Sequence, residues 1–171
     1  MSYLTGKTVY LAGPISAVTD NEATTWRNHI SNELEKFGCN ILDPCKKTIY
    51  GELGDDKKMF QNLIKERKFQ EVKEKFYPIV RKDLRMVDKS DFLIVVYDPT
   101  IHMCGTLAEV VLGHTQRKPM LLYIAPEHME KINPWILTYF KVSWIYDDWN
   151  NMIEYLKQID AGHFDTSYWT I

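Results

Sequence analysis

Two carboxylates in this sequence stand where an α/β protein could use them for chemistry. Glu109 lies in the stretch CGTLAEVVLG, soon after a strongly apolar run. If Thr106 caps the helix that begins here, Glu109 falls in its first turn, where the helix dipole favours the ionised carboxylate. Such a group at the mouth of a sheet is suited to attack an electrophilic carbon. The alternative is that Glu109 only complements the dipole or forms a capping box with Thr106.

Asp83 is the second carboxylate, in the stretch PIVRKDLRMVDKSDF that precedes the most apolar run. Helical spacing from Asp83 to Val87 could turn its side chain toward the same edge of the sheet as Glu109. A carboxyl group kept protonated by burial near another carboxylate can assist the departure of a leaving group. The alternative is a solvated charge among Arg81, Lys82 and Arg85.

The hydrophobic pattern indicates the elements that would position these groups. Short apolar runs at 8–12, 39–42, 92–97, 120–125 and 142–146 are expected to be strands, with helix-like stretches at 21–37, 106–117 and 148–159. Most of the runs are continuous, as in strands that are covered on both faces. We therefore expect an α/β fold with a doubly wound, five-stranded parallel sheet, in a flavodoxin- or Rossmann-like three-layer sandwich.

The segment at about 50–80 differs from this alternation. It is rich in Lys and Glu and carries apolar residues at helical spacing. One or two amphipathic helices are the favoured interpretation, and a flap over the site is the alternative. Without an internal repeat or low-complexity linker, we expect a single domain over 1–171 with a helical insertion at about 50–80.

In open α/β sheets, ligands bind beyond the carboxyl ends of the strands. Gly13, Pro14 and Ile15 follow the first expected strand, and the glycine lets the backbone approach a ligand closely. The segment 98–105 follows the central strand and contains Asp98 and His102. A plain strand-to-helix turn is the alternative interpretation of the first of these loops.

Composition limits the classes of ligand. The net charge is -2, from 21 Lys and Arg against 23 Asp and Glu, so no basic excess points to nucleic acid. The three cysteines are odd in number and lack CxxC spacing, which indicates neither a disulfide framework nor a zinc site. The apolar runs are too short to span a membrane. We expect a cytoplasmic protein that acts on a small molecule and needs no metal and no cofactor.

Several of these stretches, in this order, resemble the nucleoside 2-deoxyribosyltransferase family. They are VYLAGPIS, the Trp26–Arg27 pair, RKDLRMVDKSDFLIVVYD, and CGTLAEVVLG followed by RKP, and the resemblance spans most of 7–146. It implies a flavodoxin-type homodimer or higher homo-oligomer that takes a deoxynucleoside and a free base as substrates. Such an enzyme moves 2-deoxyribose between bases through a covalent glycosyl-enzyme intermediate.

The resemblance also implies roles for individual residues. Glu109 matches the nucleophile that attacks C1′, and Tyr10 matches the tyrosine that hydrogen-bonds this glutamate. Asp83 matches the aspartate that contacts the base and handles its proton. Asn133 resembles the asparagine that a neighbouring subunit lends to the 5′ side of the sugar. From their place in the loops beyond the strands, and not from the resemblance, we also expect substrate contacts at Gly13, Pro14, Ile15, Asp98, His102 and Gly105.

The sequence departs from the family pattern at one loop and leaves alternatives open. Asp98 is the only carboxylate near the base-holding loop, and Cys104 stands where related monophosphate hydrolases place a serine. A 2′-deoxynucleoside 5′-monophosphate N-glycosidase, with Ser16 and Arg27 holding the phosphate, is the main alternative. A phosphoribohydrolase ranks lower because paired glycines before Cys104 are absent. A nucleotide-binding module without catalysis is the non-enzyme alternative.

Two aromatic groups remain. Trp135, Tyr139, Phe140 and Trp144 are expected in the core or in a subunit interface, where aromatic residues are enriched. The C-terminal stretch GHFDTSYWTI is too aromatic for a free tail. We expect it to dock on a partner subunit or to close a pocket.

Overall fold

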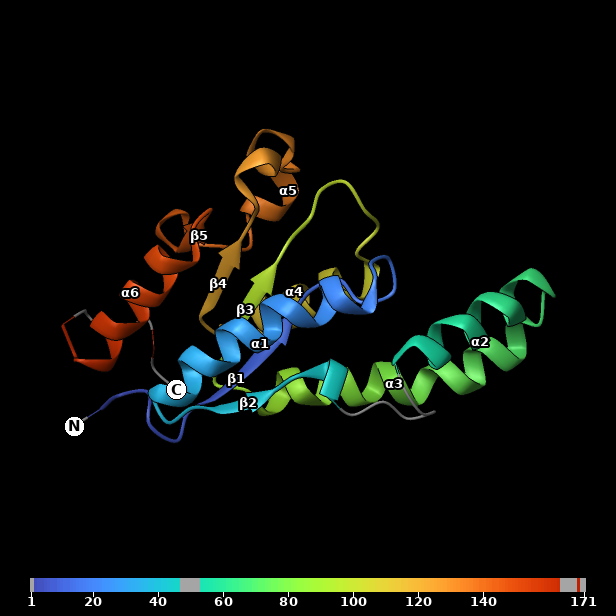
Figure 1. Ribbon diagram of the computed structural model, residues 1–171, viewed down its shortest axis with the longest axis horizontal. Helices are drawn as coiled ribbons and strands as arrows, with labels where there is room; N and C mark the ends of the chain where they lie inside the picture. Colours follow the sequence, from blue (N-terminus) through green and yellow to red (C-terminus); the bar gives the residue numbers. More distant parts are fainter. Residues whose placement is uncertain (1, 47–52, 164–168, 170–171) are drawn as a thin grey trace.

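The computed structural model describes residues 2–46, 53–163 and 169. Its core is a five-stranded sheet in the order β2-β1-β3-β4-β5, in which every neighbouring pair is parallel (Figure 1). The strands are β1 Thr8–Ala12, β2 Asn40–Leu42, β3 Phe92–Val96, β4 Met120–Tyr123 and β5 Ile145–Tyr146. This strand order is that of doubly wound, flavodoxin-like proteins, so the predicted fold class is confirmed.

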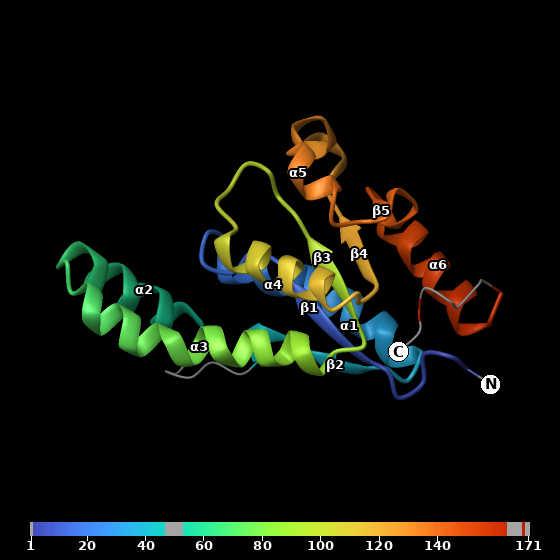
Figure 2. The same ribbon diagram turned by 180° about the vertical axis from the view of Figure 1, so that it is seen from behind.

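Helices cover both faces of this sheet. Alternate residues of β1 point to opposite sides, with Val9 and Leu11 in one apolar cluster and Tyr10 and Ala12 in the other. The first cluster includes residues of α1 Asp20–Lys36 and α6 Trp149–Asp160. The second includes residues of α3 Phe69–Lys89 and α4 Cys104–Thr115, on the face that is nearer in Figure 2. Because both faces are buried, the strands are continuous apolar runs.

Helix α1 begins and ends at residues that satisfy its free backbone groups. Thr19 is the N-cap and forms a capping box with Glu22, in which each side chain accepts a hydrogen bond from the other's backbone N–H. After the helix, Gly38 adopts a positive φ of 75°, the conformation that a glycine commonly takes just beyond a helix end. The helix therefore starts at a fixed point beyond the carboxyl end of β1.

The expected amphipathic segment forms a helical hairpin. Helix α2 Leu53–Lys65 turns back into α3, and the two project well beyond the sheet in both ribbon views (Figures 1 and 2). Helix α3 continues past residue 80 to Lys89, so one helix is both an arm of the hairpin and the connection into β3. Among the described helices, none is long and apolar enough to cross a membrane.

The carboxyl-terminal half differs from the prediction at its edge strand. The segment Val142–Trp144 is a 3-10 turn and only Ile145–Tyr146 pairs with β4, because Val142 is 86% exposed and has no core to face. The remaining short elements are the 3-10 turns η1 Pro44–Lys46 and η2 Pro126–Lys131 and the helix α5 Pro134–Leu137.

Trp169, near the end of the chain, is 1% exposed in the core of its own subunit. Its ring packs edge-on against Phe92 with ring centroids 5.0 Å apart, and its indole N–H donates to the Tyr155 hydroxyl at 3.1 Å. The backbone carbonyl of Trp169 accepts a hydrogen bond from the Tyr3 hydroxyl. Trp169 thus joins the first apolar cluster of its own chain, while residues 164–168 and 170–171 of the predicted docking tail lie outside the described residues.

Replacing Trp169 by alanine should therefore remove a core side chain. We expect Trp169→Ala to lower the free energy of unfolding by about 3–5 kcal/mol, since a large aromatic group leaves a cavity. Trp135→Ala is the matched control, because Trp135 is 71% exposed and its loss should cost less than about 0.5 kcal/mol. Guanidinium unfolding followed by circular dichroism measures both, and equal effects would contradict the docking of Trp169.

Candidate active site

Glu109 lies on the face of α4 that packs against the sheet. It is 8% exposed, and its Oε1 accepts a hydrogen bond of 2.8 Å from the Tyr10 hydroxyl on β1. Gly113, one turn later, allows this close approach: a Cβ atom there would lie 2.9 Å from Sδ of Met120 and 3.2 Å from Cδ2 of Leu93. The hydrogen bond implied by the resemblance is therefore present, and it joins the helix to the strand.

The local environment of Glu109 differs from the one predicted. Helix α4 begins at Cys104 after Met103, which makes no side-chain cap, so Thr106 lies inside the helix and is buried. Glu109 consequently falls in the second turn, and the first turn has no acidic residue. The capping box and the first-turn dipole interaction were both wrong, because α4 starts three residues earlier than a cap at Thr106 would place it.

Burial decides the protonation of Glu109. The pKa of this carboxyl is raised from 4.5 to about 8, chiefly by burial and also by the nearby Asp83 carboxylate. The Tyr10 hydrogen bond and the Arg27 charge act in the opposite direction and lower the pKa. The same burial, together with Glu109, raises the pKa of the Tyr10 hydroxyl well above its ordinary value, so Tyr10 remains a hydrogen-bond donor.

Asp83 lies near the carboxyl end of α3, on the same side of the sheet as Glu109. It is half-buried, and its Oδ1 is buried with no hydrogen-bond partner among the described residues. Burial raises its pKa from 3.8 to about 6, against the lowering effects of Lys82 and Arg27. Asp83 is thus no solvated surface charge, and it holds a buried polar oxygen that a ligand could meet.

The loop after β1 carries Gly13, Pro14 and Ile15, with Gly13 buried and the other two half-buried. Arg27 of α1 is 0% exposed and donates to the carbonyl oxygens of Gly13 at 2.9 Å and Pro14 at 3.4 Å. Its guanidinium is therefore committed to this loop. The idea that Arg27 binds a phosphate was wrong, since a fully buried cation bound to carbonyl groups offers no face to a ligand.

The loop after β3 holds the other predicted residues. Asp98 is half-buried, and its Oδ1 accepts hydrogen bonds from the backbone N–H and the hydroxyl of Thr100, at 2.8 and 2.6 Å. It also lies 3.9 Å from Nε2 of His128 in η2, the turn after β4. His102 and Gly105 are exposed near the start of α4. Gly105 lies one helical turn before Glu109, but the side-chain hydrogen bond of the Glu109 carboxylate in the described part of the chain goes to Tyr10 and to neither of these residues.

Asn133 is exposed and serves as the N-cap of α5, where its Oδ1 accepts from the backbone N–H of Trp135 at 2.9 Å. Its own backbone N–H bonds to the Tyr97 hydroxyl and lowers the pKa of that group, against the larger rise from burial. A single chain does not test whether Asn133 reaches a neighbouring subunit's sugar, and that role stays a prediction.

Three residues of this region were missed or misjudged from the sequence. Asp43, after β2, is buried and lies 3.5 Å from Nε of Arg27. Arg27 shares the buried stripe of α1 with Ala23 and Ile30, a spacing that signals a buried cation. His128 faces Asp98 across two loops, a proximity that arises only when neighbouring strands bring their carboxyl ends together.

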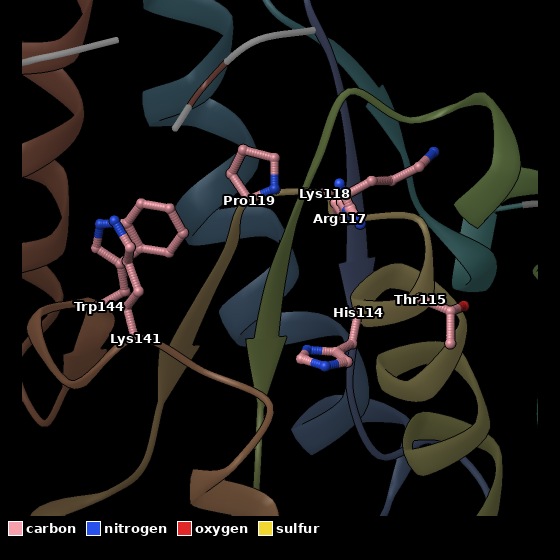
Figure 3. Close-up of a pocket in the computed structure, with 7 residues that line it drawn as sticks. All are labelled: His114, Thr115, Arg117, Lys118, Pro119, Lys141 and Trp144. Carbon is pink, nitrogen blue, oxygen red and sulfur yellow. The ribbon is translucent and has the colours of Figure 1, made fainter. Parts of the chain in front are cut away.

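No group of three or more His, Cys, Asp or Glu side chains with metal-binding geometry occurs among the residues described. A shallow pocket at the opposite edge of the sheet, where β4 begins, is lined by His114, Thr115, Arg117, Lys118, Pro119, Lys141 and Trp144 (Figure 3). The Lys118 ammonium is already bound by the carbonyl oxygens of Val87, Asp88 and Ser90, so it does not offer a ready anion site.

Comparison with known proteins adds independent findings. The model of the family described as nucleoside 2-deoxyribosyltransferase matches residues 9–155. The chain is similar in structure to a 2-deoxyribosyltransferase from the psychrotolerant bacterium Bacillus psychrosaccharolyticus, with a TM-score of 0.55, 18% identity and 96% of each chain covered. A conserved protein from Enterococcus faecalis V583 gives a TM-score of 0.60 at 16% identity, covering 91% of this chain and 99% of the other.

A CMP N-glycosidase from Clostridium botulinum is more distant, with a TM-score of 0.48, 16% identity and the same coverage of 91% and 99%. No curated protein matches the chain. At these identities the likeness to solved structures shows the fold, whereas the family model spans the strands and helices that carry Tyr10, Asp83 and Glu109. The chain belongs to the nucleoside 2-deoxyribosyltransferase family.

Proposed function

We propose that this protein transfers 2-deoxyribose between nucleobases by cleaving the N-glycosidic bond of a 2′-deoxynucleoside through a covalent intermediate on Glu109. The observation that carries the proposal is the buried carboxylate of Glu109, hydrogen-bonded to Tyr10 and electrostatically coupled to Asp83. Two carboxyl groups with different environments are what an N-glycoside-cleaving site requires.

Glu109 acts as the nucleophile in this proposal. One carboxylate oxygen attacks C1′ as the bond from C1′ to the base nitrogen breaks, and the bonding electrons leave with the base. The transition state has oxocarbenium character, which a nearby carboxylate stabilises by its charge. The Tyr10 hydroxyl holds Oε1, leaving the other oxygen free to form the bond to C1′. Attack by a second base then reverses the step and releases the new nucleoside.

Asp83 acts as the acid that protonates the departing base and as the base that deprotonates the incoming one. Its pKa, raised by burial to about 6, keeps a share of it protonated near neutrality. Transfer runs through the same states in both directions, so one group serves both half-reactions. This needs the bases to exchange while the sugar stays attached to Glu109.

Charge favours a nucleoside over a 5′-monophosphate as the substrate. Hydrogen bonds from Thr19 lower the pKa of Glu22, in the first turn of α1, whereas the Asp98 charge raises it. The Lys57 ammonium also lowers this pKa and is already paired with Asp20 at 2.5 Å. The pKa of Tyr123 is raised chiefly by burial, and the negative charges of Glu127, Asp148 and Asp147 raise it further. These negative neighbours would repel a phosphate dianion at this edge, whereas they would not repel an uncharged 5′-hydroxyl.

Replacing the nucleophile is the first test. Glu109→Gln should reduce turnover of a deoxynucleoside in the presence of a second free base by about 10³-fold or more, because the amide cannot form the glycosyl ester. Chromatography of a panel of deoxynucleosides and acceptor bases measures the new nucleoside. Glu35→Gln, on the exposed side of α1, is the matched control and should retain wild-type turnover.

The same panel, extended to the deoxynucleoside 5′-monophosphates, separates the alternatives. A new deoxynucleoside supports transfer, whereas free deoxyribose and base alone would show that water is the acceptor. Activity confined to the 5′-monophosphates would contradict the choice of substrate. Full activity of Glu109→Gln would remove the covalent mechanism altogether.

The pH dependence provides a second test. Transfer needs Glu109 ionised and Asp83 protonated, while their pKa values of about 8 and about 6 favour the opposite distribution. The productive form, with Glu109 ionised and Asp83 protonated, is therefore the minor one of the two singly protonated forms. We expect kcat/KM to rise with pH through about 6 and to fall above about 8. In Asp83→Asn the alkaline fall should disappear, because only Glu109 must then titrate; its persistence would assign that limb to another group.

The leaving group tests the acid role of Asp83 directly. Asp83→Asn should slow cleavage of ordinary deoxynucleosides by about 10²-fold or more, since the base must leave without a proton. With a deoxynucleoside of an N7-methylated purine, whose base is already cationic, the same variant should cleave at nearly the wild-type rate. Single-turnover rates with the two substrates measure this difference, and equal losses would mean that Asp83 does not deliver the proton.

A further inference from the structure

Arg27 is a fully buried cation whose hydrogen bonds go to the backbone beside the site. Its guanidinium donates to the carbonyl oxygens of Gly13, Pro14 and Ala23. The Gly13 and Pro14 carbonyls belong to the loop that leaves the carboxyl end of β1, three and four residues beyond Tyr10, which bonds to Glu109. Helix α1 thus holds the strand's exit loop through one side chain.

The same guanidinium also contacts the neighbouring loop. Its Nε lies 3.5 Å from Oδ1 of Asp43, whose side chain is 2% exposed and follows β2. That carboxylate oxygen in turn accepts the backbone N–H of Cys45 at 2.9 Å. Arg27 and Asp43 together therefore fix the positions of two carboxyl-edge loops relative to each other, which lysine's single ammonium could not match.

Packing around Arg27 leaves little freedom for this arrangement. The guanidinium carbon lies 4.4 Å from the centroid of the Trp26 ring, and a Cβ atom on Gly13 would approach that ring to 2.6 Å. The capping box at Thr19 sets the start of the helix that carries both side chains. Loop, ring and guanidinium thus occupy one closely packed layer beside β1.

Arg27 also acts on the charges of the site. Burial raises the pKa values of Glu109, Asp83 and Tyr10, and Arg27 lowers all three. Two kinds of charge or hydrogen bond otherwise affect these pKa values. Glu109, Asp83 and Tyr10 act within the group, and Lys82 lowers the pKa of Asp83. Arg27 is therefore the cation whose charge acts on all three of these groups, without any contact to Glu109.

We propose that Arg27, paired with Asp43, is a positioning residue of the site: it fixes the loops after β1 and β2 and supplies the buried positive charge that balances the Asp83–Glu109 pair. The inference rests on the proposed function for its kinetic consequences. Its geometry and electrostatics are properties of the protein without substrate.

Two variants separate the two roles. Arg27→Lys keeps the charge but loses the planar fork, and it should lower kcat/KM by roughly 10- to 100-fold with the limbs of the pH profile in place. The double variant Arg27→Met with Asp43→Asn removes both buried charges, so neither is left unpaired. It should lower kcat/KM further and move both limbs to higher pH. Arg81→Met, an exposed arginine on α3, is the matched control and should leave both readouts unchanged.

A measurement without turnover keeps the inference separate from the proposed function. The side-chain carboxyl of Glu109 is followed by ¹³C NMR in ¹³C-glutamate-labelled protein, with its signal assigned by its loss in Glu109→Gln. In the Arg27→Met, Asp43→Asn protein this signal should titrate at higher pH than in the wild type. Circular dichroism verifies that the variants are folded. If the double variant does not fold, the kinetics of Arg27→Lys serve as the test.

The outcomes are distinct. Folded variants at Arg27 with wild-type kcat, KM and pH profile, or an unmoved Glu109 titration in the double variant, would overturn the inference. A wild-type protein that cleaves no deoxynucleoside would overturn the proposed function, while the titration would still decide the role of Arg27.

Discussion

The hydrogen bond from the Tyr10 hydroxyl to Glu109 is the contact on which the site depends. It runs 2.8 Å between the middle of a central strand and the second turn of a helix, in a region where both residues are buried. For it to form, α4 must lie directly on the sheet, and Gly113 removes the side chain that would prevent this approach. The three-layer fold and the position of the carboxylate are thus one packing arrangement.

Burial governs the chemistry of Glu109 more strongly than the helix dipole does. A favourable dipole contributes about 0.3–1 kcal/mol in the first turn and fades beyond it. Taking a carboxylate out of water costs several kcal/mol even after the protein relaxes. A second-turn glutamate against the sheet therefore has a raised pKa, and nearby Asp83 adds to the rise. The protonated carboxyl is therefore favoured at rest. In the proposed mechanism Glu109 must lose this proton while Asp83 holds one.

The hydrophobic pattern predicted the sheet because burial on both faces leaves continuous apolar strands, and β1 Thr8–Ala12 has the predicted limits. It misplaced the start of α4, since Thr106 is a good cap residue that the structure instead buries within the helix. The hydrogen bond at Glu109 was implied by family resemblance. The Asp43–Arg27 pair and the approach of His128 to Asp98 join residues far apart in the chain, and no local spacing indicates such contacts. Trp169 is similar, because its partners Tyr3 and Phe92 lie at the other end of the sequence or in the central strand.

The two edges of the sheet treat polar groups differently, and this difference supports the proposed position of the site. At the amino edge Lys118 is bound by three carbonyl oxygens, Asp91 accepts from the backbone of Thr8, and Asp160 accepts from that of Leu4. On the side of the carboxyl edge, the buried atoms Oδ1 of Asp83 and Nδ1 of His128 have no hydrogen-bond partner in the described part of the chain. Each such atom costs about 1–3 kcal/mol, so a fold keeps them where a ligand completes them. That reasoning favours a substrate with hydrogen-bonding edges, as a nucleobase has, at the end of the sheet where Glu109 and Asp83 are coupled.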